Sequence, residues 1–261
     1  MNNALPNSGP GLRPARPAPT AGDWLRRFHP RPGTRLVCFP HAGGAASFFF
    51  PLSQRLSGAD VLAVQYPGRQ DRRGEALITD IGELADHVVA VLRTQDAPAP
   101  VLFGHSMGAV VAFEVARRLD RAGTPPRALI ASGSRAPSIP RTEGVHLRDD
   151  EGILAAIRQL NGTDAALLGN EELTRMILPA VRGDYRAVES YRYEPGPPLS
   201  CPVVSFIGDA DPMVSIAEAD AWRDHTGAGF DLHTFPGGHF YLAAQQDAVL
   251  EALSGTLAAL R

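Results

Sequence analysis

Apolar positions along the chain alternate between short runs typical of buried strands and longer stretches with helical spacing. The runs that predict strands span residues 35–39, 61–65, 101–103, 128–131, 203–207 and 231–235. Helical spacing predicts helices over about 80–94, 108–121, 215–225 and 243–259. Strands that alternate with helices of this length are typical of a parallel sheet covered on both faces. The pattern therefore predicts an α/β fold with a mostly parallel central sheet.

The first residues of the chain lack any such pattern. Residues 1–22 are rich in Pro, Gly, Ala, Asn and Arg and show no hydrophobic period. A segment of this composition buries too little apolar area to offset the entropy of ordering it. We therefore expect a disordered, Pro-rich lead-in, followed by a single folded domain over residues 23–261 that begins near Trp24.

A second segment interrupts the alternation in the middle of the chain. Between Pro137 and Pro198 no strand pattern occurs, whereas residues 151–160 and 171–191 look helical. Ligands bind at the carboxyl ends of the strands in open α/β sheets. We therefore expect residues 137–198 to form a helical lid above that end, with a peripheral helical pair that only packs as the alternative.

Composition narrows the class of protein. The chain has 261 residues, 44% of them hydrophobic, and a formal net charge of −3, which does not suggest a nucleic-acid binder. No apolar run reaches the roughly 18 residues that would span a bilayer, and the N-terminus lacks the apolar segment of a secretory signal. Its two cysteines, Cys38 and Cys201, are too few for a disulfide framework or a metal site. We expect a cytoplasmic, soluble protein.

A G-x-S-x-G motif at residues 104–108 marks Ser106 as the candidate nucleophile. A strand pattern enters the motif and a helix pattern leaves it, which is the context of a nucleophile elbow. The sharp turn exposes the serine oxygen, and the helix N-terminus adds partial positive charge beneath it. A side chain at either glycine would collide with the neighbouring strand or helix. A tight turn with an incidental serine is the alternative.

A serine nucleophile needs a base that takes its proton. Of the eight histidines, His239 is the candidate because it follows a P-G-G turn in the loop between the last strand and the last helix. The acid is expected after the penultimate strand, where Asp209 and Asp211 both occur. Asp211 is preferred because hydrolases of this fold usually carry the acid three residues after the glycine, here Gly208. It would orient the histidine, and Asp209 would bond loop amides.

Acyl transfer also requires donors for the oxygen that becomes negative. One is the backbone N–H of Met107, directly after the nucleophile. The other is expected in the loop after the first recognisable strand, which reads F-P-H-A-G-G over residues 39–44. We expect Ala42 to supply that amide, with Gly43 as the second choice, and a plain Gly-rich turn as the alternative.

Several motifs together resemble those of type II thioesterases, the stand-alone thioesterases of polyketide and nonribosomal peptide assembly lines. They are the P-H-A-G-G loop with its aromatic run, Y-P-G-R at 66–69, the G-H-S-M-G elbow, the segment L-P-A-V-R-G-D-Y at 178–185, and G-G-H-F at 237–240. The similarity runs from about residue 24 to the C-terminus. Gly183 departs from the alanine common in the family's lid segment, without touching the chemistry.

The resemblance implies an α/β-hydrolase fold and hydrolysis of acyl groups from the phosphopantetheine arm of acyl or peptidyl carrier proteins, which clears stalled or incorrect chains. No metal or diffusible cofactor is implied, because the partner carries the arm. Carrier domains of these pathways are commonly acidic, so Arg69, Arg72 and Arg73 are candidate docking residues, with structural or solvated arginines as the alternative. We expect a monomer.

Other functions fit the same residues. A carboxylesterase or lipase would use the same nucleophile and base on an oxygen ester. A product-releasing thioesterase, including a cyclase, would differ only in its product. A hydrolase-fold binding protein that has lost catalysis is the alternative outside enzymes, and it would not need to keep all three of Ser106, Asp211 and His239.

Overall fold

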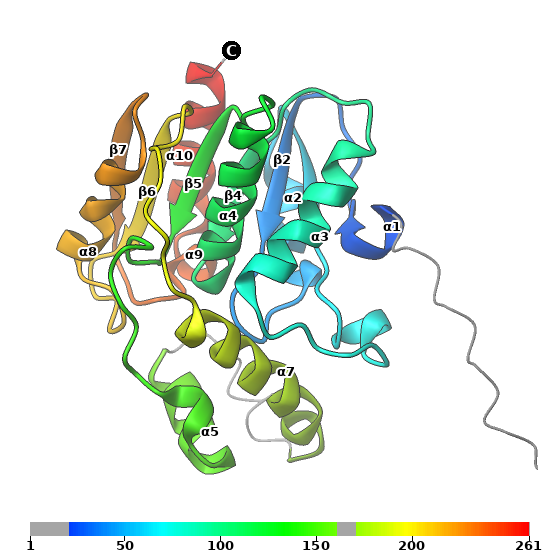
Figure 1. Cartoon of the computed structure of the whole chain (residues 1–261), viewed down its shortest axis with the longest axis vertical. Coiled ribbons are helices and arrows are strands. Elements are labelled where there is room, and N and C mark those ends of the chain that lie inside the picture. The colour runs from blue at the N-terminus through cyan, green and yellow to red at the C-terminus, as the bar shows by residue number, and fades with distance from the viewer. Residues whose placement is uncertain (1–20, 161–170, 261) are drawn as a thin grey trace, which may run out of the picture.

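The computed structural model describes residues 21–160 and 171–260, and these residues form a layered α/β structure (Figure 1). The strands are β1 Leu25–Arg26, β2 Thr34–Phe39, β3 Ala59–Val64, β4 Val101–His105, β5 Ala128–Ser132, β6 Val203–Gly208 and β7 Phe230–Phe235. They form one sheet in the order β1-β3-β2-β4-β5-β6-β7. Only β1 pairs antiparallel, with β3, and the other pairs are parallel. The predicted fold class is confirmed.

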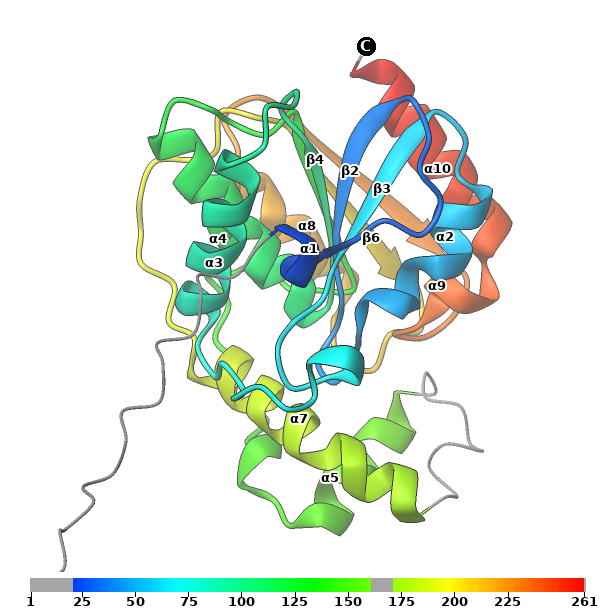
Figure 2. The ribbon, with the colours of Figure 1, turned by 90° about the vertical axis from the view of Figure 1, so that its right-hand side faces the viewer.

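Helices cover both faces of this sheet, as the buried character of its strands requires. They are α1 Ala21–Trp24, α2 Phe50–Arg55, α3 Ile81–Arg93, α4 Met107–Arg121, α5 Asp150–Gln159, α7 Glu171–Ser190, α8 Ile216–Asp220, α9 Tyr241–Ala244 and α10 Gln246–Ala259. Figure 2 shows α3 and α4 on one face, and α2, α9 and α10 on the other. Short 3-10 turns lie at η1 Ala46–Phe49, η2 Gln70–Arg72, η3 Val145–Leu147 and η4 Ala221–His225.

Two apolar clusters hold the layers together. One packs α3 and α4 against the sheet through residues such as Leu84, Val88 and Val111. The other packs α2 and α10 against the opposite face through residues such as Phe103 and Leu253. The middle of the sheet is therefore sealed from water, and chemistry can occur only where the strands end.

The helices α5 and α7 lie beyond the carboxyl ends of the strands (Figures 1 and 2). A smaller apolar cluster joins them through Ile153, Ile157, Leu178 and Val181. Residues 161–170, inside the segment expected to form a lid, lie outside the described residues, as do residues 1–20 of the expected lead-in. In the described part of the chain, no helix is both long and apolar enough to cross a membrane.

The structure differs from the predicted elements at three places. The two-residue strand β1 is too short to produce an alternating pattern, and it was not predicted. The helix expected over 215–225 is α8 followed by the 3-10 turn η4. The last helix is divided at Gln245, whose φ of −110° and ψ of 38° are not helical, so a short α9 precedes α10. None of these differences moves a strand end.

Candidate active site

Ser106 lies on the sharp turn between β4 and α4. Its φ of 55° and ψ of −117° are strained for a residue with a side chain. A Cβ atom added at Gly104 would lie 2.2 Å from the carbonyl oxygen of Gly108, and one at Gly108 would lie 2.0 Å from the carbonyl oxygen of Phe39. The two glycines therefore allow strand, turn and helix to approach as an exposed nucleophile requires.

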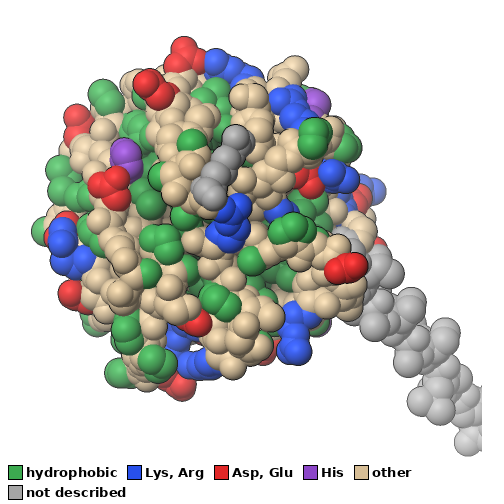
Figure 3. Space-filling view, turned by 90° about the horizontal axis from the view of Figure 1, so that it is seen from above, with side chains coloured by type: hydrophobic (Ala, Val, Ile, Leu, Met, Phe, Trp, Pro, Cys, Tyr) green, Lys and Arg blue, Asp and Glu red, His purple; other side chains and the backbone are tan. Residues whose placement is uncertain are grey.

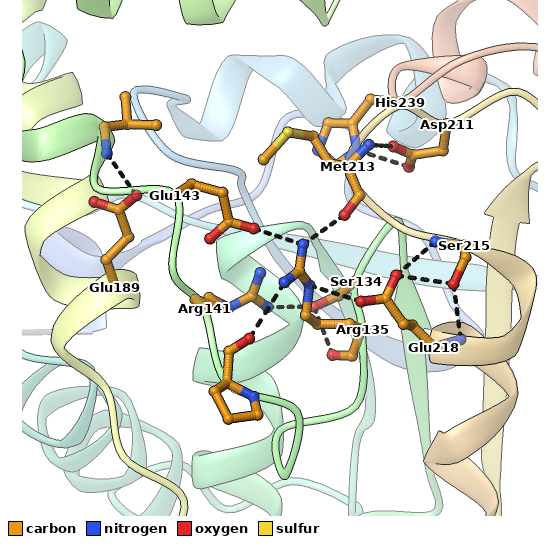
Figure 4. Close-up of polar contacts among 12 residues, drawn as sticks. Ser134, Arg135, Arg141, Glu143, Glu189, Asp211, Met213, Ser215, Glu218 and His239 are labelled. Carbon is orange, nitrogen blue, oxygen red and sulfur yellow. Dashed lines mark hydrogen bonds and ion pairs between the residues drawn. The ribbon is translucent and has the colours of Figure 1, made fainter.

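His239 and Asp211 meet at the ends of two neighbouring strands. The Nδ1 atom of His239 lies 2.8 Å from Oδ2 of Asp211, and both side chains are buried (Figure 4). The backbone N–H of Met213 donates to the other carboxylate oxygen of Asp211 over 2.8 Å. Asp209 instead accepts a hydrogen bond from the backbone N–H of Gly237, the loop-stabilising role expected for it. The Asp211 carboxylate is thus fixed from both sides.

A small cavity of about 40 Å³ joins the predicted site residues. Ser106 and His239 both line it, so the candidate nucleophile and base share one space. Ala42 and Met107, the predicted donors for the oxyanion, line it too. Asp211 stands behind His239, where it can orient the ring without touching a substrate.

Gly43, the second choice for the oxyanion donor, has another partner. Its backbone N–H donates to Oδ2 of Asp184 on α7 over 2.6 Å. The φ of Gly43 is +77°, and an added Cβ would lie 2.5 Å from a methyl carbon of Val181 on the same helix. This amide is therefore committed to α7, which leaves Ala42 as the candidate in this loop.

His105, next to the nucleophile in the sequence, packs inside the protein beneath the active site. It is fully buried, and its Nδ1 atom lies 2.9 Å from the hydroxyl of Ser132, which in turn lies 2.6 Å from the hydroxyl of Tyr241. Burial lowers the pKa of His105 well below its usual value, and the neighbouring His239 and His41 lower it further. His105 is therefore a neutral packing residue, distinct from the candidate base.

Two of the three arginines proposed for docking are structural, so that part of the prediction is wrong. Arg69 is 7% exposed and forms a buried ion pair with Asp184. Arg72 is 6% exposed, donates to the carbonyl of Gln65 and pairs with Glu75. Only Arg73 has an exposed side chain. The sequence cannot separate the two roles, because an arginine that follows a strand can either face a partner at the strand ends or stabilise the turn by hydrogen bonds.

Other pocket residues were not assigned a role from the sequence. Arg141, Glu143 and Glu189 line the cavity with Ser106. Glu189, on α7, accepts hydrogen bonds from the backbone N–H groups of Val145 and His146 and so ties α7 to η3. These residues lie 35 or more positions from the elbow, and no local spacing relates them to it.

The elbow serine, the buried His–Asp pair and the parallel sheet together define a serine hydrolase of the α/β-hydrolase fold. Among the residues that the structure describes, no group of three or more His, Cys, Asp or Glu side chains could hold a metal ion.

Comparison with known proteins identifies the family. A family model for the thioesterase domain matches residues 34–257. The chain is 47% identical over 246 residues to Thioesterase PikA5 of Streptomyces venezuelae, which covers 92% of this chain and 88% of that protein. The structure matches the type II thioesterase BorB from the borrelidin biosynthetic cluster with a TM-score of 0.84 and 51% identity, over 90% of this chain and 97% of that one. The chain belongs to the thioesterase family, among its type II members.

A further relative is considerably longer than this chain. The chain is 53% identical to a probable cadicidin biosynthesis thioesterase of Streptomyces griseus over 88% of its own length, and it spans 64% of that protein. The resemblance and the enzyme class predicted from the sequence are confirmed, and the chain is a thioesterase.

Proposed function

We propose that this thioesterase hydrolyses acyl groups from the phosphopantetheine arm of acyl or peptidyl carrier proteins, and that it clears aberrant or stalled chains from polyketide or nonribosomal peptide synthases. The observation that carries this proposal is the buried Asp211–His239 pair, 2.8 Å apart, beside a cavity shared with Ser106. The match to a type II thioesterase of a biosynthetic cluster supports the choice of a carrier-bound substrate.

The geometry supports a two-step acyl transfer. His239 takes the hydroxyl proton of Ser106 as the serine oxygen attacks the thioester carbonyl carbon, and the backbone N–H groups of Met107 and Ala42 receive the oxyanion. The C–S bond breaks, the thiol leaves with the proton from His239, and the acyl group remains on Ser106. Water then attacks the acyl ester with His239 again as base. The carboxylic acid leaves and Ser106 regains its proton.

We also propose that residues 137–198 act as a lid, because α7 contributes Tyr185, Val188 and Glu189 to the cavity. Gating elements have low local stability. The backbone amides of α5 and α7 should therefore exchange hydrogen faster than those of β4 and β5, and a bound acyl analogue should slow that exchange. Equal protection of helices and sheet, unchanged by the analogue, would leave α5 and α7 with a packing role only.

The test of the activity compares acyl-N-acetylcysteamine thioesters with matched p-nitrophenyl esters. Faster turnover of the thioester is expected, and a preference for the oxygen ester would favour a carboxylesterase. Ser106→Ala should lower turnover by roughly 10³- to 10⁶-fold while the fold survives. Mass spectrometry of the products separates hydrolysis from cyclising release, because only hydrolysis gives a linear acid.

The same acyl group on a carrier protein should react faster than on the small thiol, since a docked carrier supplies the arm at high effective concentration. Within this proposal the protein is a cytoplasmic monomer, a state that light scattering of the purified protein tests directly. On the face remote from α5 and α7, basic and acidic side chains are interspersed (Figure 3). The proposed docking site lies at the opposite end, near the cavity.

A further inference from the structure

Arg141 lies in the wall of the candidate active site and forms no ion pair with a carboxylate of the described residues. It lines the same cavity as Ser106 and His239. In the described part of the chain, its one side-chain hydrogen bond runs from a guanidinium nitrogen to the hydroxyl of Ser134, over 3.0 Å. A guanidinium carries five N–H donors, so this bond leaves most of the hydrogen-bonding capacity of Arg141 unused among the described residues.

The carboxylates near Arg141 are already occupied. Glu143 accepts a hydrogen bond from Arg135 over 2.6 Å, and Arg135 also donates to the carbonyl of Met213 in the acid loop. Glu189 is held by the backbone N–H groups of Val145 and His146. Figure 4 shows this separation, with Arg135 between Glu143 and Glu218 and Arg141 turned to Ser134.

The electrostatic balance agrees with this geometry. Burial, together with the nearby positive charge of Arg135, lowers the pKa of Arg141 to about 10. The carboxylates of Glu143, Glu218 and Glu189 offset only part of that effect. A desolvated guanidinium with unused donors is stabilised by an oxygen acceptor that enters with the ligand.

We propose that Arg141 is a specificity residue that donates a hydrogen bond to a neutral oxygen on the acyl chain, a ketone or a hydroxyl, and so favours oxygenated over saturated acyl groups. The inference rests on the proposed thioesterase function and names its substrate class. A carboxylate fits less well, because Glu143 and Glu189 line the same small cavity and would repel it. The N–H donors of Arg141 instead match acyl chains that still carry a ketone or hydroxyl oxygen because their reduction is incomplete.

The experiment measures kcat/KM for four N-acetylcysteamine thioesters: butyryl, 3-hydroxybutyryl, 3-oxobutyryl and malonyl. The use of a small thiol removes any effect of carrier docking. For each enzyme the ratio of kcat/KM for the oxygenated chain to that for butyryl is compared between the parent and a variant, so intrinsic differences in thioester reactivity cancel. Arg141→Gln should lower this ratio about 10- to 100-fold, the range of a hydrogen bond to a charged group. Butyryl hydrolysis should fall by a smaller factor than hydrolysis of the oxygenated chains, because the butyryl chain carries no acceptor for Arg141.

Two further variants keep the result interpretable. Arg141→Lys keeps the charge but loses the planar fork, and it should give an intermediate ratio. Arg186→Gln, on an exposed position of α7, is the matched control and should leave the ratio unchanged. An unchanged ratio in Arg141→Gln, or equal loss on all substrates in both Arg141 variants, would overturn the proposal.

The malonyl substrate tests the choice of a neutral oxygen. It should be a poorer substrate than 3-oxobutyryl in the parent enzyme. If malonyl alone is preferred, and that preference disappears in Arg141→Gln, the assignment to neutral oxygens is wrong. Failure of the underlying function looks different, since the parent enzyme would then hydrolyse none of the four thioesters.

Discussion

Asp184 on helix α7 forms a buried ion pair with Arg69 in the turn after β3. The side chains are only 2% and 6% exposed, and the same carboxylate oxygen also accepts the backbone N–H of Gly43. Burial raises the pKa of Asp184, whereas the positive charge of Arg69 opposes that change and favours the ionised form. One carboxylate therefore joins α7 to the loop that carries Ala42, so the position of α7 and the shape of the proposed oxyanion hole depend on each other.

Asp184→Asn should destabilise the protein strongly, because it leaves the buried guanidinium of Arg69 without a counter-charge. Breaking such a pair from one side costs about 3–5 kcal/mol of unfolding free energy. Urea denaturation measures the loss, and kcat should fall as the Gly43 loop loosens. Asp150→Asn is the control, because Asp150 forms an exposed ion pair with Arg182, worth about 1 kcal/mol or less. Similar small losses in both variants would show that the buried pair has no special role.

The two aspartates of the acid loop should differ sharply in their effect on turnover. Asp211→Asn removes the carboxylate that holds His239 and should lower kcat by about 10⁴-fold, as loss of the orienting acid does in other serine hydrolases. Asp209→Asn keeps an oxygen that can accept the Gly237 N–H. Its kcat should therefore stay within about tenfold of the parent. Steady-state kinetics of both variants decide the assignment, and the reverse order would make Asp209 the acid.

The sequence was sufficient for those parts of the site that are built locally. The elbow, the acid loop and the histidine loop each follow a strand, and parallel strands bring their carboxyl ends to one edge. Ser106, Asp211 and His239 could therefore be expected at one edge from the elbow motif and from the loop positions usual in hydrolases of this fold. The central strands were recognised because both of their faces are buried and their residues form continuous apolar runs.

Contacts between distant segments could not be predicted in this way. Asp184 lies 115 positions from Arg69 and 141 from Gly43, and its role depends on how α7 packs on the strand ends. The same limit applies to Arg72, whose guanidinium lies over the ring of Trp24, 4.6 Å from its centroid. Motif spacing shows that such an arginine is near the site, whereas only tertiary packing shows whether it faces water.

Gly108→Ala should abolish most activity and reduce stability, because the new methyl group would meet the carbonyl oxygen of Phe39. Backbone atoms cannot move aside as a flexible side chain can, so the elbow or β2 must shift. Gly255→Ala is the matched control, since nothing lies within 4 Å of an added Cβ there. In the interior of α10 it should stabilise the protein by up to about 1 kcal/mol. Thermal denaturation and turnover of the two variants test this, and an active, stable Gly108→Ala enzyme would contradict the packing described.

Acidification should destabilise the fold through two histidines, the half-buried His41 and the fully buried His105. Burial lowers the pKa of His41 to about 3 and that of His105 well below its usual value, so both are neutral in the folded protein. In the unfolded chain they take up protons near pH 6.5. Their stabilising contribution is therefore complete above that pH and is lost as the pH falls toward the folded-state values, by up to about 1.4 kcal/mol per pH unit for each histidine.

Urea denaturation at pH 7.5 and pH 5.5 measures this dependence. The unfolding free energy should be lower at pH 5.5, and His105→Gln should reduce the difference, since glutamine takes up no proton. An equal difference in parent and variant would show that His105 does not contribute.

Arg72 and Arg73 are adjacent in sequence, and their variants should fail in different ways. The guanidinium of Arg72 donates to the Gln65 carbonyl over 2.7 Å and pairs with Glu75, so it fixes the turn after β3. Arg72→Gln should lower the unfolding free energy by about 1–3 kcal/mol, because a buried acceptor loses its donor. Any loss of activity should then affect carrier-bound and small thioesters equally, since both need the same folded site.

Arg73 is exposed and is the remaining candidate of the three for contact with an acidic carrier. Arg73→Glu should leave stability within about 0.5 kcal/mol of the parent, as is usual for an exposed substitution. It should raise KM for an acyl-carrier protein without changing kinetics on the N-acetylcysteamine thioester. Added salt should mimic the variant, because charges at the surface are screened over about 10 Å at 0.1 M. Arg73→Glu could instead leave kcat and KM unchanged on both substrates while salt still raises KM for the carrier protein. The charges that guide docking would then lie elsewhere on the surface around the cavity.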